Sequence, residues 1–299
     1  MDLLAVAHPS TPIRYTECVG QIISDLLAAA RQRLAAATFS PSPREANLLL
    51  AHTLGWTEAQ ILSRRGQQLS DPEQRSFEFL LSRRLSGEPM AYIMGEREFF
   101  GRPFYVDDRV LIPRPETEHL VEAVLGLPLS RWPLIVDLGT GSGCLACTLA
   151  LELPAAKVVA VDISPAAIAV ATRNRERHQL THQVQLLASN LAGALDLANV
   201  DLIVSNPPYV GHGEIDMLSP EIRDFEPAVA LYAGDEGNLI HQRLLGELHG
   251  LSSGSWLVVE IGAGQEEMIR ALCQSSPFQC HEVLPDYAGH ARVAILQRG

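Results

Sequence analysis

The chain has 299 residues, of which 47% are hydrophobic and 19% are charged, a balance typical of a folded globular protein. This composition excludes a disordered chain and a collagen-like repeat, and no apolar run approaches the roughly 20 residues that span a bilayer. The net charge is −12, of which −11 falls in residues 111–299, and this argues against stable nucleic-acid binding because phosphates require a basic surface.

Residues 1–87 predict a small helical bundle. Apolar residues recur there at helical spacing. Ser42, Thr57 and Ser70 each stand where a helix should begin, since a hydroxyl oxygen accepts from the free backbone N–H groups of the first turn. Pro43 is expected at the first helical position of the second helix. The expected helices cover residues 21–37, 43–54, 57–62 and 70–87.

Residues 88–112 change to strand-like patterns and predict a β-hairpin that links two domains. Aromatic and β-branched residues favour extended backbone, and Asp107-Asp108 indicates a turn. The proline at 113 ends the last strand because it lacks a backbone N–H group. The expected strand-like stretches are 99–101, 104–106 and 110–112.

Residues 113–299 alternate strands and helices, which predicts an α/β domain. The strands read as continuous apolar runs, as in a parallel sheet covered on both faces. We expect a seven-stranded, doubly wound, Rossmann-like sheet whose last two strands close it as an antiparallel pair. The expected strands are 134–137, 157–162, 184–187, 202–205, 256–261, 279–284 and 291–296, and the main helices are 116–125, 143–153, 165–178, 238–248 and 265–274.

A glycine-rich loop follows the first of these strands. Gly139, Gly141 and Gly143 allow unusual backbone angles at a helix N-terminus, where a ligand can approach closely. The next strand ends in Asp162, which can accept hydrogen bonds from both ribose hydroxyls of a nucleoside. A dinucleotide fingerprint needs glycine where Cys144 stands, so another nucleoside ligand is indicated.

Cysteine and histidine spacing predicts neither disulfides nor a metal site. Five scattered cysteines fit reduced thiols in the cytoplasm, and the chain starts without the pattern of a signal peptide. Cys144 and Cys147 lie among apolar residues, which favours buried thiols over a redox pair. His178 and His182 straddle a helix end and are expected to be exposed loop residues. The remaining cysteines are Cys18, Cys273 and Cys280.

Residues 201–209 carry the sharpest chemical signal. A hydrophobic strand runs into Asn206-Pro207-Pro208-Tyr209 at the edge of the sheet where such folds bind ligands. The side-chain oxygen of Asn206 and the carbonyl of Pro207 can accept from one NH2 group, and the ring of Tyr209 offers a flat surface for an amide or a base. Acceptors on those hydrogens stabilise a nitrogen that becomes positive as it is alkylated.

These motifs resemble those of known methyltransferases. The D-x-G-x-G-x-G spacing of residues 137–143 resembles the first motif of class I enzymes that use S-adenosylmethionine, and N-P-P-Y resembles the amino-methyltransferases. From about residue 20 to 297 the chain is similar to the protein-(glutamine-N5) methyltransferases of peptide chain release factors. The motifs are Pro89-x-x-Tyr92-Ile93-x-Gly95, Phe99-x-Gly101, residues 111–118, Phe225-Glu226-Pro227 with Ala230-Leu231, and residues 286–289 with Arg292-Val293.

The resemblance implies a reaction and a set of site residues. A methyl group would pass from S-adenosylmethionine to the side-chain amide nitrogen (N5) of the glutamine in the Gly-Gly-Gln loop of class 1 release factors. The implied cofactor-binding residues are Asp137, Gly139, Thr140, Gly141, Ser142, Gly143, Asp162, Asn190, Leu191 and Asn206. The implied substrate-binding residues are Asn206, Pro207, Pro208 and Tyr209, of which Asn206, Pro207 and Tyr209 are catalytic. The family commonly has Asp where Asn190 stands, so its adenine contact carries no charge.

Two other hypotheses fit parts of the pattern. An adenine-N6 methyltransferase acting on nucleic acid shares the N-P-P-Y chemistry, but it would need a basic groove. The presence of an intact Asn206 and Tyr209 argues against a cofactor-binding adaptor without catalysis. The helical domain is expected to dock a protein substrate, with Arg64-Arg65 and Arg83-Arg84 as candidates or as ordinary solvated charges. Arg114 and Glu116 shape the cofactor pocket or the fold, and a monomer is expected.

Overall fold

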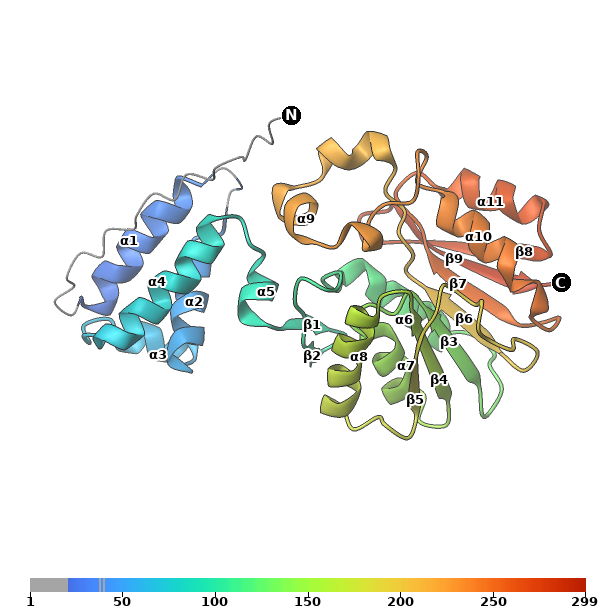
Figure 1. Cartoon of the computed structure of the whole chain (residues 1–299), viewed down its shortest axis with the longest axis horizontal. Helices are drawn as coiled ribbons and strands as arrows, with labels where there is room; N and C mark the ends of the chain where they lie inside the picture. The colour runs from blue at the N-terminus through green and yellow to red at the C-terminus, as the bar shows by residue number, and fades with distance from the viewer. Residues whose placement is uncertain (1–20, 38, 40) are drawn as a thin grey trace, which may run out of the picture. The chain divides into compact units, whose positions relative to one another are not determined.

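The computed structural model describes residues 21–37, 39 and 41–299, so Cys18 lies outside the described residues. The chain divides into two compact units, one ending at Ser86 and the other spanning Gly87–Gly299 (Figure 1). Within the part of the chain that is described, no helix has both the length and the apolar character needed to cross a membrane.

In the described residues of the first unit, four helices pack around fully buried side chains that include Leu27, Leu50 and Phe77. The helices are α1 (Ile23–Ala35), α2 (Glu45–Leu54), α3 (Glu58–Ser63) and α4 (Asp71–Leu85). Thr57 and Gln60 make the reciprocal bonds of a capping box before α3, which confirms that expected start. The expected start of α2 was two residues early, because residues 43–44 form a turn ahead of Glu45.

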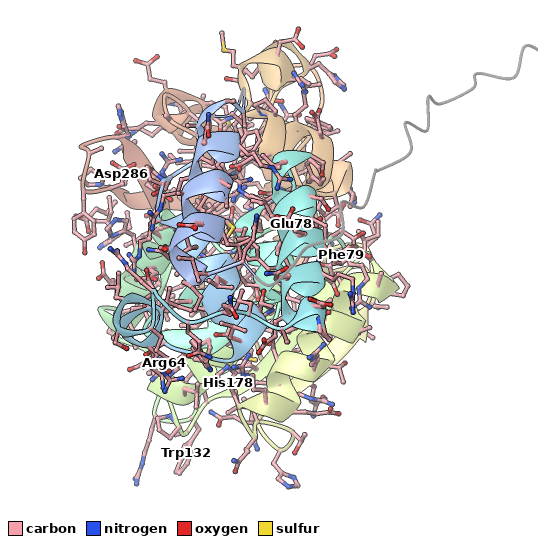
Figure 2. The ribbon with its side chains drawn as sticks, turned by 90° about the vertical axis from the view of Figure 1, so that its left-hand side faces the viewer. Arg64, Glu78, Phe79, Trp132, His178 and Asp286 are labelled. Carbon is pink, nitrogen blue, oxygen red and sulfur yellow. The ribbon has the colours of Figure 1, made fainter. Side chains whose placement is uncertain are left out.

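The arginine pairs of this unit differ in exposure. Arg84 is buried, stacks over Phe39 and pairs with the carboxylate of Glu45, so its assignment as a docking residue is wrong. Arg64 is exposed and stacks over Trp56 at 4.4 Å. Figure 2 shows Arg64, together with Glu78 and Phe79 of α4, among the surface side chains. Arg64 therefore remains a docking candidate.

The hairpin belongs to the second unit. After α5 (Met90–Met94), β1 (Arg97–Phe99) pairs antiparallel with β2 (Arg102–Phe104) through a two-residue turn, in which Phe100 and Gly101 have φ values of 51° and 70°. Residues 110–112 do not form the expected strand. Val110 and Ile112 instead pack against Tyr92 and helix α8 (Pro165–Arg177) in a buried cluster, so burial explains their apolar pattern without strand pairing.

The seven-stranded sheet confirms the predicted fold. Its order is β5-β4-β3-β6-β7-β9-β8, with parallel pairs throughout except that β9 runs antiparallel to β7 and β8. Because β3, β4, β6 and β7 are parallel, the loops that follow them meet at one edge of the sheet. The strands are β3 (Leu134–Leu138), β4 (Lys157–Asp162), β5 (Val184–Ala188), β6 (Leu202–Ser205), β7 (Trp256–Glu260), β8 (Phe278–Pro285) and β9 (Ala291–Arg298).

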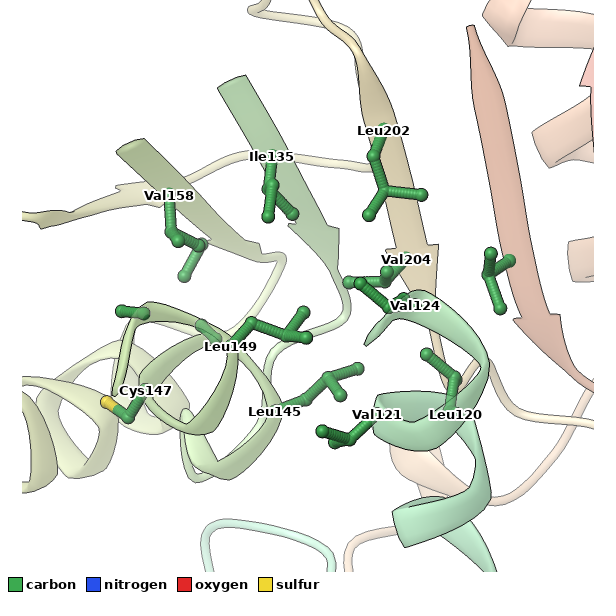
Figure 3. Packing of buried hydrophobic residues seen from close by; sticks show 14 of the residues in the cluster. Leu120, Val121, Val124, Ile135, Leu145, Cys147, Leu149, Val158, Leu202 and Val204 are labelled. Atoms are coloured by element: carbon green, nitrogen blue, oxygen red, sulfur yellow. The ribbon is translucent and has the colours of Figure 1, made fainter. Parts of the chain in front are cut away.

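Helices cover both faces of the sheet. On one face α6 and α7 pack against alternate strand residues such as Ile135 and Leu202 (Figure 3). On the other, α10 and α11 pack against residues such as Val136 and Ile203. The helices are α6 (Glu118–Leu125), α7 (Cys144–Glu152), α8 (Pro165–Arg177), α10 (Leu239–Glu247) and α11 (Glu266–Gln274), with α9 (Pro220–Phe225) and the short 3-10 turns η1 (Pro115–Thr117), η2 (His212–Met217), η3 (Ala228–Ala230) and η4 (Leu248–Gly250).

The structure shows how deeply the thiols and histidines singled out in the sequence are buried. Cys144 and Cys147 are free and buried, and burial raises the pKa of the Cys144 thiol to about 12, which disfavours the thiolate that redox chemistry needs. His178 is half-buried rather than exposed, since its ring packs on Phe104 at 4.7 Å. No group of three or more potential metal ligands occurs among the described residues.

Candidate active site

The glycine loop leaves open space beside its backbone. Gly139 and Gly141 have φ values of 80° and 54°, and a Cβ atom placed on either would meet no atom within 4 Å. Gly143 differs, because a Cβ there would lie 3.1 Å from the Cβ of Ala171, so this glycine lets α7 pack closely on α8. The first two glycines thus provide the close backbone approach that a bound cofactor requires.

Asp137 orders this loop from beneath. It is the penultimate residue of β3, is buried, and accepts a 2.6 Å hydrogen bond from the hydroxyl of Thr140. Burial raises the pKa of Asp137 to about 7, and the nearby charge of Asp162 adds to the rise. The side chain of Ser142 is buried as well, so the loop turns its backbone rather than its polar side chains outward.

Asp162 lies across from the loop at the end of β4. Its Oδ2 accepts from the backbone N–H of Gly141 at 2.8 Å and its Oδ1 from that of Ser164 at 2.9 Å. Each carboxylate oxygen has a further lone pair, so two ribose hydroxyls can still donate to this carboxylate. Burial raises the pKa of Asp162 despite these bonds. The residues present therefore fit the nucleoside part of S-adenosylmethionine.

The expected adenine border follows β5. Ser189 donates its N–H to the carbonyl of Asp162, which places Asn190 and Leu191 beside the same edge. The Oδ1 of Asn190 already accepts from Arg243 at 3.1 Å, and this bond occupies one of its lone pairs. Leu191 has φ of 46°, a left-handed conformation unusual for a side chain of this size. Contact of either residue with adenine remains a prediction.

Asn206 follows β6, next to β3 in the sheet, and is held by an unpredicted partner. Its Nδ2 donates to Thr117 Oγ1 at 2.9 Å, and the Thr117 hydroxyl donates to Glu260 Oε2 at 2.7 Å. Among the described residues nothing donates to Asn206 Oδ1, and this oxygen is not one of the buried unpaired atoms. Asn206 is therefore oriented with its acceptor available.

Tyr209 shares the same carboxylate. Its hydroxyl donates to Glu260 Oε1 at 3.3 Å, while its backbone carbonyl accepts from the Gln265 side chain at 3.1 Å. Burial raises the pKa of the Tyr209 phenol, so this group stays neutral. Pro207 is buried and Pro208 is half-buried. Their rings fix the backbone φ angles between Asn206 and Tyr209.

Sequence reasoning missed Thr117 and Glu260, although one signal was present. Glu260 is an acidic residue that ends an apolar strand, as Asp162 does. It is fully buried, and burial raises its pKa to about 7. Thr117 gave no such signal, because it follows a proline-rich stretch 143 residues before its partner.

Arg114 has a structural role in the same region. Its guanidinium donates to both carboxylate oxygens of Glu226, at 2.7 and 2.8 Å, and the Glu226 side chain is almost fully buried. This ion pair joins the segment before η1 to the segment after α9. Arg114 was expected to shape either the cofactor pocket or the fold, and this geometry supports a role in stabilising the fold around the site.

A groove of about 740 Å³ lies beside α6 and the β8–β9 hairpin. Its lining includes His119, Trp256, His281 and Tyr287, and none of the predicted site residues. The loop chemistry described above, and not the volume of this groove, locates the candidate active site at the ends of β3, β4, β6 and β7.

Family profiles and curated relatives match residues of both units. The profile of the PrmC N-terminal domain matches residues 25–95, and that of the methyltransferase small domain matches residues 118–222. A release factor glutamine methyltransferase of Koribacter versatilis is 42% identical over 261 residues, covering 86% of this chain and 91% of that protein. One of Cereibacter sphaeroides is 39% identical over 271 residues, covering 90% and 96%.

Solved structures share the fold. The hMettl16 catalytic domain, in complex with the MAT2A 3′UTR hairpin 6, superimposes with a TM-score of 0.53 at 17% identity and covers 78% of this chain and 84% of its own. At such low sequence identity, this likeness shows only that the fold is shared. The two curated relatives, by contrast, match this chain over nearly their whole lengths. The chain belongs to the release factor glutamine methyltransferases, a family of S-adenosylmethionine-dependent enzymes.

Proposed function

We propose that this chain methylates the N5 atom of the glutamine in the Gly-Gly-Gln loop of class 1 peptide chain release factors. The two curated relatives described above are release factor glutamine methyltransferases. The observation that carries the proposal is the orientation of Asn206, whose NH2 group is bound to Thr117 and whose Oδ1 is left as an acceptor. An acceptor at this position suits a substrate NH2 group.

The residues of the N-P-P-Y segment then act on the amide. Asn206 Oδ1 and the Pro207 carbonyl accept its two hydrogens, which aims the nitrogen lone pair at the methyl group, and Tyr209 supports the amide plane. S-adenosylmethionine would supply the methyl group, whose bond to the sulfonium sulfur breaks with its electron pair left on sulfur, giving S-adenosylhomocysteine. As the new C–N bond forms, the nitrogen becomes positive and both acceptors bind more strongly. The methylated amide then loses one proton to water.

The cofactor would be held at the neighbouring half of the edge. Gly139 and Gly141 leave room for the methionine part, and Thr140 holds the loop through Asp137. Asp162 retains lone pairs for the ribose hydroxyls. These contacts support the cofactor-binding assignment, with Asn190 and Leu191 as its adenine side.

The helical unit would dock the release factor. Its exposed Phe79 and Arg64 supply an apolar and a cationic contact of the kind that protein interfaces use. We propose that the enzyme acts as a cytoplasmic monomer and forms no stable complex with nucleic acid. The acidic charge of residues 111–299 supports the last point.

Transfer of labelled methyl from S-adenosylmethionine tests the function. Purified release factor, the same factor with Gly-Gly-Ala in place of Gly-Gly-Gln, and unmethylated DNA are offered in parallel. We expect label on the intact factor alone, and mass spectrometry of the peptide should place it on the glutamine. Label on DNA would instead support adenine-N6 methylation. Bound cofactor without transfer to any of the three would refute the proposed substrate.

A further inference from the structure

One carboxylate holds both polar side chains of the N-P-P-Y segment. Glu260, at the end of β7, is fully buried. Its Oε1 accepts from the Tyr209 hydroxyl and its Oε2 from the Thr117 hydroxyl, which in turn contacts Asn206. Thr117 ends η1 directly before α6, so elements from three parts of the chain converge on one amide.

The hydrogen count fixes the direction of these bonds. A threonine hydroxyl has one hydrogen, and Glu260 in its ionised form has only acceptors, so in that form the Thr117 hydrogen goes to Glu260. Thr117 Oγ1 can then only accept, and the group of Asn206 that lies 2.9 Å away must be its NH2. The Oδ1 of Asn206 is consequently turned away from Thr117.

We propose that Thr117 and Glu260 are positioning residues that make the site select an amide over a carboxylate. They hold Asn206 with its oxygen toward the substrate, where a glutamine NH2 can donate to it. A glutamate would bring its own lone pairs against that oxygen, with no hydrogen to share. A site built to hydrogen-bond one group discriminates strongly against an analogue that lacks it. This inference rests on the proposed function.

Substitution of the threonine separates positioning from folding. Thr117→Val keeps the shape but removes the acceptor, so the Asn206 amide can rotate and spend part of its time reversed. We expect kcat for factor methylation to fall about tenfold, the loss of roughly one hydrogen bond, with unchanged affinity for S-adenosylmethionine. Thr117→Ser retains the hydroxyl and should restore most of kcat.

A competition experiment reads the selectivity directly. A release factor carrying Gly-Gly-Glu is titrated as an inhibitor of Gly-Gly-Gln methylation. It should compete poorly with the wild-type enzyme and several-fold better with Thr117→Val, in which the Asn206 NH2 can face the carboxylate. Glu260→Gln should shift the preference in the same direction, because its new NH2 group can donate to Thr117 and reverse the chain of bonds.

Thr148→Val is the matched control. Thr148 is a buried threonine of α7 whose hydroxyl has no hydrogen-bond partner, so this change should alter neither kcat nor the preference. If wild-type enzyme does not label the factor, the proposed function fails. If it does, and Thr117→Val and Glu260→Gln keep the wild-type kcat and preference, only the positioning inference is overturned. Equal losses of kcat and cofactor affinity would overturn it too, since they indicate a general structural role.

Discussion

The two halves of the ligand-binding edge use the same pair of groups in different ways. In the cofactor half, the buried carboxylate of Asp137 accepts from Thr140, three residues further along the chain. In the substrate half, the buried carboxylate of Glu260 accepts from Thr117, 143 residues earlier. Each carboxylate lies at or next to the end of an apolar strand, and burial raises the pKa of each to about 7.

The difference lies in what each pair orders. The local pair shapes a loop whose backbone receives a ligand, and glycines provide the necessary space. The long-range pair orients side chains, because the chemistry depends on which end of the Asn206 amide faces the substrate. A backbone site can thus be encoded within one short segment, whereas an oriented amide requires partners from separate elements.

The largest expected effect is a loss of kcat when the substrate half of the site is disrupted. Asn206→Ala removes the side-chain acceptor for the substrate NH2, and kcat should fall about 10²- to 10³-fold, as when one preorganised transition-state partner is lost. Affinity for S-adenosylmethionine, measured by calorimetry, should change little. Unchanged methyl transfer by a folded Asn206→Ala enzyme would contradict the assigned role.

The pH dependence of stability tests the feature that the two halves share, a buried carboxylate whose pKa is raised. The folded protein keeps protons on Glu260 and Asp137 that the unfolded chain releases near pH 4, so stability should fall as pH rises to about 7 and then level off. For Glu260 a pKa raised from 4.5 to about 7 corresponds to about 3 kcal/mol.

Urea unfolding of wild type and Glu260→Gln at pH 5 to 8 measures this effect. The variant should show a flatter pH dependence. Asp286→Asn is the control, because the N–H of His290 lowers the pKa of Asp286, which therefore titrates below this range. Equal slopes in wild type and Glu260→Gln would show that Glu260 does not titrate in the folded protein.

Alanine substitutions at Gly141 and Gly143 distinguish a glycine that admits the cofactor from one that allows two helices to pack closely. Both substitutions impose left-handed strain of about 1–2 kcal/mol, but only Gly143→Ala also presses a methyl group against Ala171. Gly143→Ala should therefore destabilise the protein more in urea unfolding. Gly141→Ala should instead weaken cofactor binding out of proportion to its effect on stability. The reverse ranking would mean that the two glycines have been assigned the wrong roles.

The smallest effect concerns the cofactor half. Asp162→Asn keeps one carbonyl oxygen for the ribose but removes the charge and one acceptor, so affinity for S-adenosylmethionine should fall about tenfold. Calorimetry on the folded variant measures this loss. Binding as tight as in wild type would show that the ribose hydroxyls do not use this carboxylate.

Much of the fold could be predicted from local patterns. The seven strands lie within two residues of their expected bounds, because continuous apolar runs such as residues 134–136 mark strands buried on both faces. The same reasoning failed at Val110–Ile112, where an equally apolar stretch is buried without pairing. Hydrophobicity reports burial, and only the neighbouring elements decide whether a buried stretch joins a sheet.

Charged residues show the same limit. Arg84 looked like half of a surface pair, yet it is buried against Glu45, because the helical packing that encloses it involves residues far apart in the sequence. Glu260 carried a recognisable signal as an acidic strand end, but its partners could not be inferred. Thr117 lies in the motif of residues 111–118, but its role could not be inferred, since a threonine acquires such a role only from what folding places beside it.

The sequence by itself determined the bounds of the seven strands, the glycine loop with Asp137 and Thr140, the acidic end of β4 and the N-P-P-Y segment, because each is a run of residues close together in the chain. The tertiary structure decided which way the Asn206 amide points. That orientation follows from a hydrogen-bond chain through Thr117 to Glu260, and the direction of such a chain is defined only when all its donors and acceptors lie in contact.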